Sequence, residues 1–126
     1  MAIEWHSDGS ATMYQGDTGY CRITGINQDY NWTVYLAIHD KNRNQVGEEQ
    51  YISSNYADYV EIFIPKELSD LMTVPKNQKK EIYTYGIKLC RTENGRTFED
   101  TMHVGSVNYE KENTITVYPR KAQGTV

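Results

Sequence analysis

Residues 83–104 read YTYGIKLCRTENGRTFEDTMHV, with the pair Asn94-Gly95 near their centre. Asparagine and glycine tolerate the left-handed backbone that a two-residue type I′ turn requires. Alternating polar and apolar residues flank the pair, so the segment is predicted to form a β-hairpin. The two-residue turn fixes its register: Glu93 faces Arg96, Leu89 faces Asp100, Ile87 faces Met102 and Tyr85 faces Val104.

This register sorts the hairpin residues into two faces. The face predicted to be buried also includes the misfit Asp100, and its apolar members are Tyr83, Tyr85, Ile87, Leu89, Phe98, Met102 and Val104. The opposite face carries Lys88, Cys90 and Glu99 and is predicted to point outward.

Alternation with a period of two recurs along the chain, whereas no segment shows sustained helical periodicity. It is clearest in residues 32–38, where Trp32, Val34, Leu36 and Ile38 share one face. Further strands are predicted at residues 17–24, 46–53, 59–64 and 114–118, and a short helix at residues 65–72, which opens with proline.

About seven strands, spaced about ten residues apart and separated by turn residues, predict an all-β protein. The expected architecture is a two-sheet antiparallel β-sandwich, immunoglobulin-like or jelly-roll-like, with one short helix; a closed barrel is the alternative. The 126 residues correspond to one domain. Its expected parts are an N-terminal arm (1–14), the sandwich (15–119) and a C-terminal tail (120–126).

Composition argues against two classes of partner. The net charge is −4 and the basic residues are scattered, so the electrostatic surface that nucleic-acid binding needs is not expected. No stretch approaches the roughly 20 apolar residues of a membrane span. Residues 1–6 lack the features of a secretory signal, so if Met1 is the natural start we expect the chain to fold in a reducing cytoplasm.

Cys21, Trp32 and Cys90 follow the order of the immunoglobulin core, in which two cysteines form a disulfide next to a tryptophan. Two observations argue against that core here. The hairpin register turns Cys90 outward while Cys21 faces inward, and Lys88 occupies the position where a tyrosine corner would stand. We therefore expect two free thiols.

Metal binding and catalysis find little support in the residue patterns. Asp40, Asn42 and Asn44 match the start of a calcium loop, but its glycine and closing glutamate are replaced by Gln45 and Tyr51, and a hairpin turn explains the same residues. The histidines His6, His39 and His103 share no ligand spacing. Because no nucleophile motif or Gly-rich loop is present, we expect no cofactor and no enzyme activity.

The outward positions of the strands carry three aromatic residues, Tyr20, Tyr35 and Phe63. Together they could form one exposed patch. Three interpretations stay open. The residues cover loops or the helix of the same chain or stand singly without a function, they form a protein interface, or they form a sugar-stacking platform as in carbohydrate-binding modules.

Four segments in this order suggest a family: residues 15–19 (QGDTG), 32–40, 83–87 (YTYGI) and 114–119. The chain resembles the small N-terminal β-sandwich domain of phage baseplate upper proteins and related tail or fibre proteins. The resemblance implies an adaptor that docks on a symmetric virion part, with other virion proteins and further copies of itself as partners. It also implies synthesis in a bacterial host cytoplasm and a final location in the virion, and it brings no catalytic residues.

Overall fold

The computed structural model describes residues 3–102 and 113–122, and it confirms the predicted all-β sandwich with one short helix. The strands are β1 (Ile3–Trp5), β2 (Ala11–Tyr14), β3 (Gly19–Thr24), β4 (Thr33–His39), β5 (Gln50–Ser53), β6 (Tyr59–Ile64), β7 (Glu81–Glu93), β8 (Arg96–Met102) and β9 (Thr114–Tyr118), and the helix is α1 (Lys66–Ser69). The described part of the chain contains no helix with the length and hydrophobicity that a membrane span requires.

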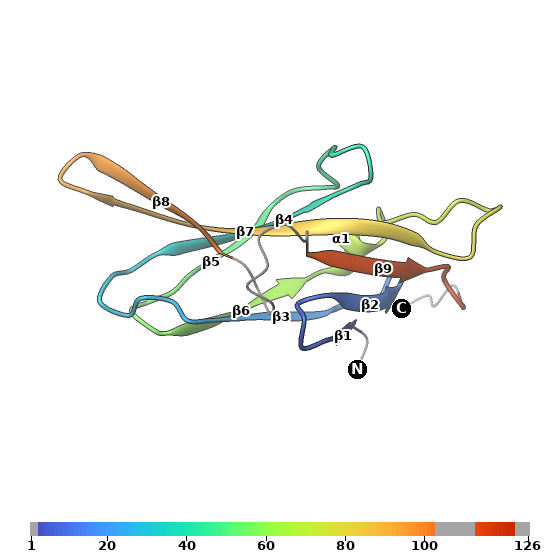
Figure 1. Ribbon diagram of the computed structural model, residues 1–126, viewed down its shortest axis with the longest axis horizontal. Coiled ribbons are helices and arrows are strands. Elements are labelled where there is room, and N and C mark those ends of the chain that lie inside the picture. The colour runs from blue at the N-terminus through green and yellow to red at the C-terminus, as the bar shows by residue number, and fades with distance from the viewer. Residues whose placement is uncertain (1–2, 103–112, 123–126) are drawn as a thin grey trace.

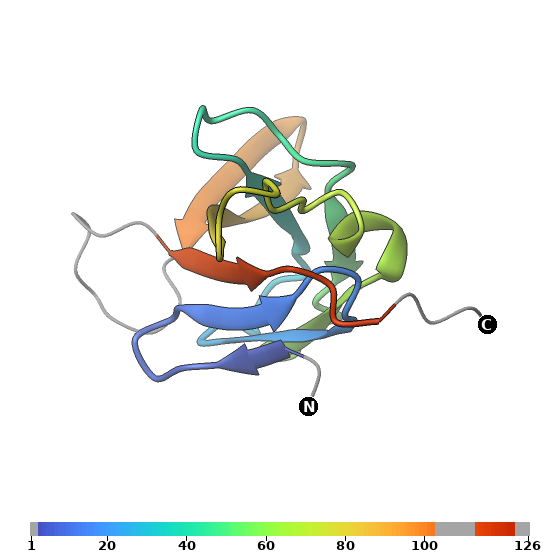
Figure 2. The ribbon, with the colours of Figure 1, turned by 90° about the vertical axis from the view of Figure 1, so that its right-hand side faces the viewer.

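Two sheets face each other across the core (Figure 1). The larger sheet has the order β1-β2-β9-β7-β4-β5, with β8 also paired to β7, and the smaller sheet consists of β3 and β6. The larger sheet curls around the smaller one, which brings β1 close to β3 and β5 close to β6 (Figure 2).

One strand pair departs from the predicted antiparallel arrangement. Strands β2 and β9 are parallel, whereas the other described pairs are antiparallel. Parallel neighbours need a long connection. Most of the domain lies between β2 and β9 in the sequence, so the connection is long enough for parallel pairing. No local sequence pattern predicts that these two strands pair.

The predicted N-terminal arm is also corrected. Its residues 3–14 contain β1 and β2, which extend the larger sheet, and Ile3, Ala11 and Met13 are buried in the core. The segment therefore packs as part of the sandwich. Its strands of three and four residues are too short for a period of two to be recognised, and the partner of β2 lies at the other end of the sequence.

The hairpin register predicted from Asn94-Gly95 is confirmed. Both residues have the left-handed φ values of a type I′ turn, 51° and 75°. The pairs Glu93–Arg96, Leu89–Asp100 and Ile87–Met102 form as expected, whereas Val104 lies outside the described residues. The predicted inward row of β7 is buried: Tyr83, Tyr85, Ile87 and Leu89.

The outer half of this hairpin projects beyond the sandwich (Figure 1). No described strand lies opposite its inner-face side chains past Leu89, and Phe98 is 38% exposed instead of buried as predicted. The same geometry explains Asp100, which is exposed and not a buried polar residue. We call this projecting part, residues 91–100, the hairpin arm.

The two cysteines lie where the register placed them. Cys21 is buried in the core from β3, while Cys90 is half-buried on the outward face of β7 and pairs across the hairpin with Glu99. Both thiols are free, as predicted. Because Cys21 points into the core while Cys90 points away from it, the two thiols cannot meet between the sheets as the cysteines of the immunoglobulin core do.

The segment Gln15-Gly16-Asp17 forms the turn between β2 and β3. Contacts in and around this turn hold together β2, the end of α1 and Arg120. The Gln15 side-chain amide donates a hydrogen bond to the carbonyl oxygen of Asp70 (2.8 Å), just after α1. Arg120, predicted to begin a tail, forms an ion pair with the Asp70 carboxylate. Gly16 has a φ of 90°, and a Cβ added there would stand 2.7 Å from the Arg120 guanidinium.

We expect the substitution Gly16→Ala to destabilise the protein by about 1–3 kcal/mol, because alanine is strained at positive φ and its methyl group displaces Arg120. Urea denaturation measures the change. Gly86→Ala is the matched control, since Gly86 lies in β7 with nothing within 4 Å of the added Cβ. Equal stability of the two variants would contradict the fastening role of this turn.

Thiol labelling of the native protein at pH 8 should modify Cys90 much faster than Cys21. Burial raises the pKa of Cys21 to about 12, so only about one part in ten thousand is the reactive thiolate at that pH. The variants Cys21→Ala and Cys90→Ser separate the two rates, and unfolding in guanidinium should make them similar. Equal labelling rates in the native state would show that the face assignment is wrong.

Candidate interaction surfaces

The three aromatic candidates lie on two opposite surfaces. Tyr20 and Phe63 project from the outer face of the smaller sheet, whereas Tyr35 projects from the outer face of the larger sheet. The outer faces of a sandwich point away from each other, so the single patch predicted from the sequence does not form. Alternation along a strand distinguishes inward from outward positions, but it does not tell to which sheet a strand belongs.

On the smaller sheet, Tyr20 and Phe63 are direct cross-strand neighbours with ring centres 5.1 Å apart. They are 54% and 43% exposed. Tyr59 lies on the same face, and the Arg22 guanidinium stands over its ring, 4.2 Å from the centre. We call this set, completed by Glu61, the aromatic face.

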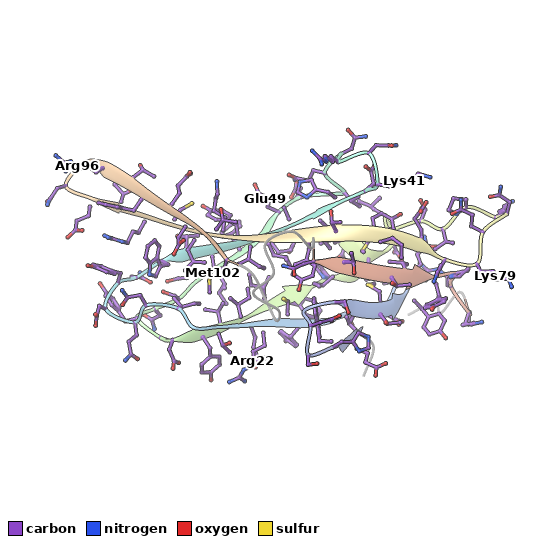
Figure 3. The ribbon with its side chains drawn as sticks, viewed as in Figure 1. Arg22, Lys41, Glu49, Lys79, Arg96 and Met102 are labelled. Carbon is purple, nitrogen blue, oxygen red and sulfur yellow. The ribbon has the colours of Figure 1, made fainter. Side chains whose placement is uncertain are left out.

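Arg22 joins the aromatic face from β3 and extends away from the body of the molecule (Figure 3). Its guanidinium is 3.4 Å from the Glu61 carboxylate, and both side chains are largely exposed. Such a pair contributes little to stability, at most about 1 kcal/mol. Arg22 and Glu61 thus remain largely exposed beside the aromatic rings.

The sequence signal for Arg22 and Tyr59 was present, because both alternate with inward residues on strands already predicted. Which residues become neighbours across the sheet follows from the β3–β6 register, which places Arg22 opposite Glu61. No turn of two residues links these strands, so that register was not readable from the sequence.

The larger sheet carries a second aromatic pair on its outer face. Tyr35 faces Tyr51 across β4 and β5, with ring centres 5.8 Å apart, and Tyr51 is 69% exposed. On its other side Tyr35 faces Lys88 of β7. Lys88 lies 3.4 Å from Glu99 of β8, so this surface is aromatic at one end and charged at the other.

Arg91 occupies the inner face at the base of the hairpin arm, where the core ends. Its side chain is only 13% exposed, and its guanidinium stacks 3.8 Å from the ring centre of Tyr30 and 4.1 Å from that of Phe98. On a third side, the Trp32 ring centre lies 5.1 Å from the Arg91 guanidinium. The guanidinium also donates a hydrogen bond to the Glu93 carboxylate at 2.7 Å. The hairpin register predicts that Arg91 lies opposite Phe98. The contact between Arg91 and Tyr30 depends on the tertiary structure.

A pocket of about 460 Å³ opens beside Arg91 at this end of the sandwich, lined by Asp29, Tyr30, Asn31, Tyr56, Arg91, Thr92 and Glu93. Tyr56 follows Asn55 in a turn where both residues have positive φ, 59° and 50°. The Asn31 side-chain oxygen holds this turn by accepting a hydrogen bond from the Asn55 amide at 2.8 Å. Tyrosine rings next to carboxylates and an amide suit a small polyhydroxyl ligand.

The clearest pKa shifts belong to groups that hold the fold. Burial raises the pKa of Tyr85, whose hydroxyl donates a hydrogen bond to the carbonyl oxygen of Gly9. Burial likewise raises the pKa of Tyr83, which donates to the carbonyl oxygen of Thr73. Hydrogen bonds and ion pairing with Lys66, and then with Arg120, lower the pKa of the Asp70 carboxyl.

The metal-like motifs have structural explanations where they are described. The Asp40 carboxylate accepts hydrogen bonds from the amides of Asn42 and Asn44, both at 2.9 Å, as expected of a hairpin turn. His6 contacts the Thr12 hydroxyl, and His103 lies outside the described residues. Within residues 3–102 and 113–122, no three His, Cys, Asp or Glu side chains gather into a group that could hold a metal ion.

No protein family model and no curated protein matches the chain.

Proposed function

We propose that this chain is a non-catalytic assembly domain of a phage virion, which binds another virion protein through the aromatic face. The observation that carries the proposal is the grouping of Tyr20, Tyr59 and Phe63 with Arg22 on one exposed two-stranded surface. Tyrosine, phenylalanine and arginine are enriched in protein interfaces, and aromatic residues and arginine often supply most of the binding energy there.

The aromatic face suits a protein partner because the binding free energy would come mainly from burying its aromatic rings. A large aromatic side chain buries about 150–250 Å² when covered. The exposed pair of Arg22 and Glu61 supplies charges at the side of the rings, where they would orient a partner and contribute little to its affinity.

The virion setting is supported by the resemblance to phage baseplate upper proteins and tail or fibre proteins. One of its segments, residues 15–19, includes the turn that fastens β2, α1 and Arg120 together. A rigid sandwich that presents binding surfaces on its outer faces is what an adaptor between virion parts requires.

The test uses particles from a phage that carries the gene for this chain. The gene is deleted, the native or variant chain is supplied from a plasmid, and quantitative mass spectrometry measures the chain in purified particles. We expect the native chain at fixed stoichiometry and at least a tenfold loss for the double variant Tyr20→Ala, Phe63→Ala, because truncation removes the proposed anchors.

Tyr51→Ala is the control, since it removes a more exposed ring from the opposite surface. Thermal unfolding of the isolated variants should show little change, because the substituted side chains are exposed. Absence of the native chain from the particles would refute the proposal. Equal losses for the control and the double variant would remove the aromatic face from it.

A carbohydrate-binding module is the second candidate function, and the pocket beside Arg91 is the observation that favours it. The platform predicted from Tyr20 and Tyr35 does not form, because these residues lie on opposite surfaces. The pocket instead offers Tyr30 and Tyr56 as rings and Asp29, Asn31 and Glu93 as polar groups.

Glycan-array binding tests this second function. If it is correct, the native protein retains a defined set of glycans, and Tyr56→Ala abolishes that binding because it removes the exposed ring of the pocket. Tyr51→Ala should leave the binding unchanged. A native protein that retains no glycan above background would exclude this candidate.

A further inference from the structure

The hairpin arm presents a strand edge on which no described residue is paired. Strand β8 pairs with β7 on one side, and its residues from Arg96 to Thr101 are exposed. Figure 1 shows the arm extending past the end of the sandwich, where a second strand has access to it. An exposed edge of this kind is a template for pairing with another chain.

The turn determines which backbone groups point from this edge. In a two-residue hairpin, the residues that flank the turn, here Glu93 and Arg96, form a hydrogen-bonded pair. Hydrogen-bonded and non-hydrogen-bonded pairs then alternate along the strands. Residues 96, 98, 100 and 102 therefore direct their N–H and C=O groups toward β7, and residues 97, 99 and 101 direct theirs outward.

We infer that β8 pairs with β8 of a second copy of this chain, antiparallel and centred on Phe98. Two-fold symmetry pairs residue i with residue j so that i + j stays constant, and outward groups must meet outward groups. The symmetry centre therefore falls on a residue and not between two residues. This leaves few registers to compare.

The charges of β8 distinguish these registers. A centre on Glu99 or on Asp100 would place two identical carboxylates directly opposite each other, which is destabilising. A centre on Phe98 places Arg96 opposite the partner's Asp100, twice by symmetry, and the two Phe98 rings face each other. A centre on Thr97 places Arg96 opposite the partner's Phe98 and forms no ion pair.

The same charges explain why the edge would be selective. Charged residues on an edge strand normally prevent unspecific pairing. Here they oppose two of the four registers compared and favour one, which is how a specific interface excludes wrong partners. The ladder is short, so the dimer should be weak in isolation and concentration-dependent. This inference concerns a different surface from the aromatic face and does not rest on the proposed function.

Analytical ultracentrifugation of the full chain from about 10 µM to about 1 mM tests the pairing. We expect a monomer–dimer equilibrium that Arg96→Asp or Asp100→Arg weakens at least tenfold, because each single reversal places like charges opposite each other twice. The double variant Arg96→Asp, Asp100→Arg should recover dimerisation, since the opposite charges then face each other in exchanged positions.

Lys41→Glu is the matched control for Arg96→Asp. It makes the same change in charge, but on the β4–β5 loop, away from β8 (Figure 3). Thr97→Pro provides a second arm: it removes an outward N–H without removing a β7–β8 hydrogen bond. It should abolish the dimer while circular dichroism stays native. A strictly monomeric native chain, or a double variant that does not recover, would overturn the inference.

A monomeric chain that still enters phage particles would refute the β8 pairing and leave the proposed function standing. A chain that dimerises with the expected variant pattern but is absent from phage particles would support the β8 pairing and refute the proposed function.

Discussion

The inward-facing row of β7 side chains sets how the larger sheet packs against the core. Tyr83, Tyr85, Ile87 and Leu89 occupy alternate positions of one long strand and are all buried. Strand β4 pairs along one edge of β7, while β9 and β8 divide the other edge between them. Because side chains alternate strictly in a strand, a one-residue slip would turn this whole row toward solvent. The row therefore fixes the larger sheet, and the smaller sheet covers it.

The surfaces that remain after the core is formed differ in character. The aromatic face combines exposed rings with an arginine and suits burial against a protein. The hairpin arm offers backbone hydrogen-bonding groups and a charge pattern, so its recognition is directional. Arg91, stacked between Tyr30 and Phe98, lies where the arm joins the body. This stacking holds the base of the arm at a place where the opposite sheet no longer supports it.

Two independent surfaces would give an assembly domain the means to bind in two directions. A weak contact between copies becomes effective once another contact holds those copies close together, because linkage raises the local concentration. An edge-to-edge pairing that is marginal in solution therefore suits a protein that is already held on a virion part. The sandwich between the surfaces supplies the rigid spacing that such geometry needs.

Four features are predictable without the structure: the all-β class, the register of the β7–β8 hairpin, the opposite orientations of Cys21 and Cys90, and the outward positions of the aromatic candidates. These features depend on local rules, namely the turn chemistry of Asn94-Gly95 and the period of two along a strand. Other features become visible only in the folded chain: β2 lies parallel to β9, residues 3–14 belong to the sandwich, and Tyr35 lies on a different surface from Tyr20 and Phe63. The folded chain also shows that the hairpin extends beyond the smaller sheet, which leaves Phe98 exposed. Local rules do not reach these features, because they depend on pairing and packing between segments distant in sequence, where no turn fixes the register and alternation does not identify the partner strand.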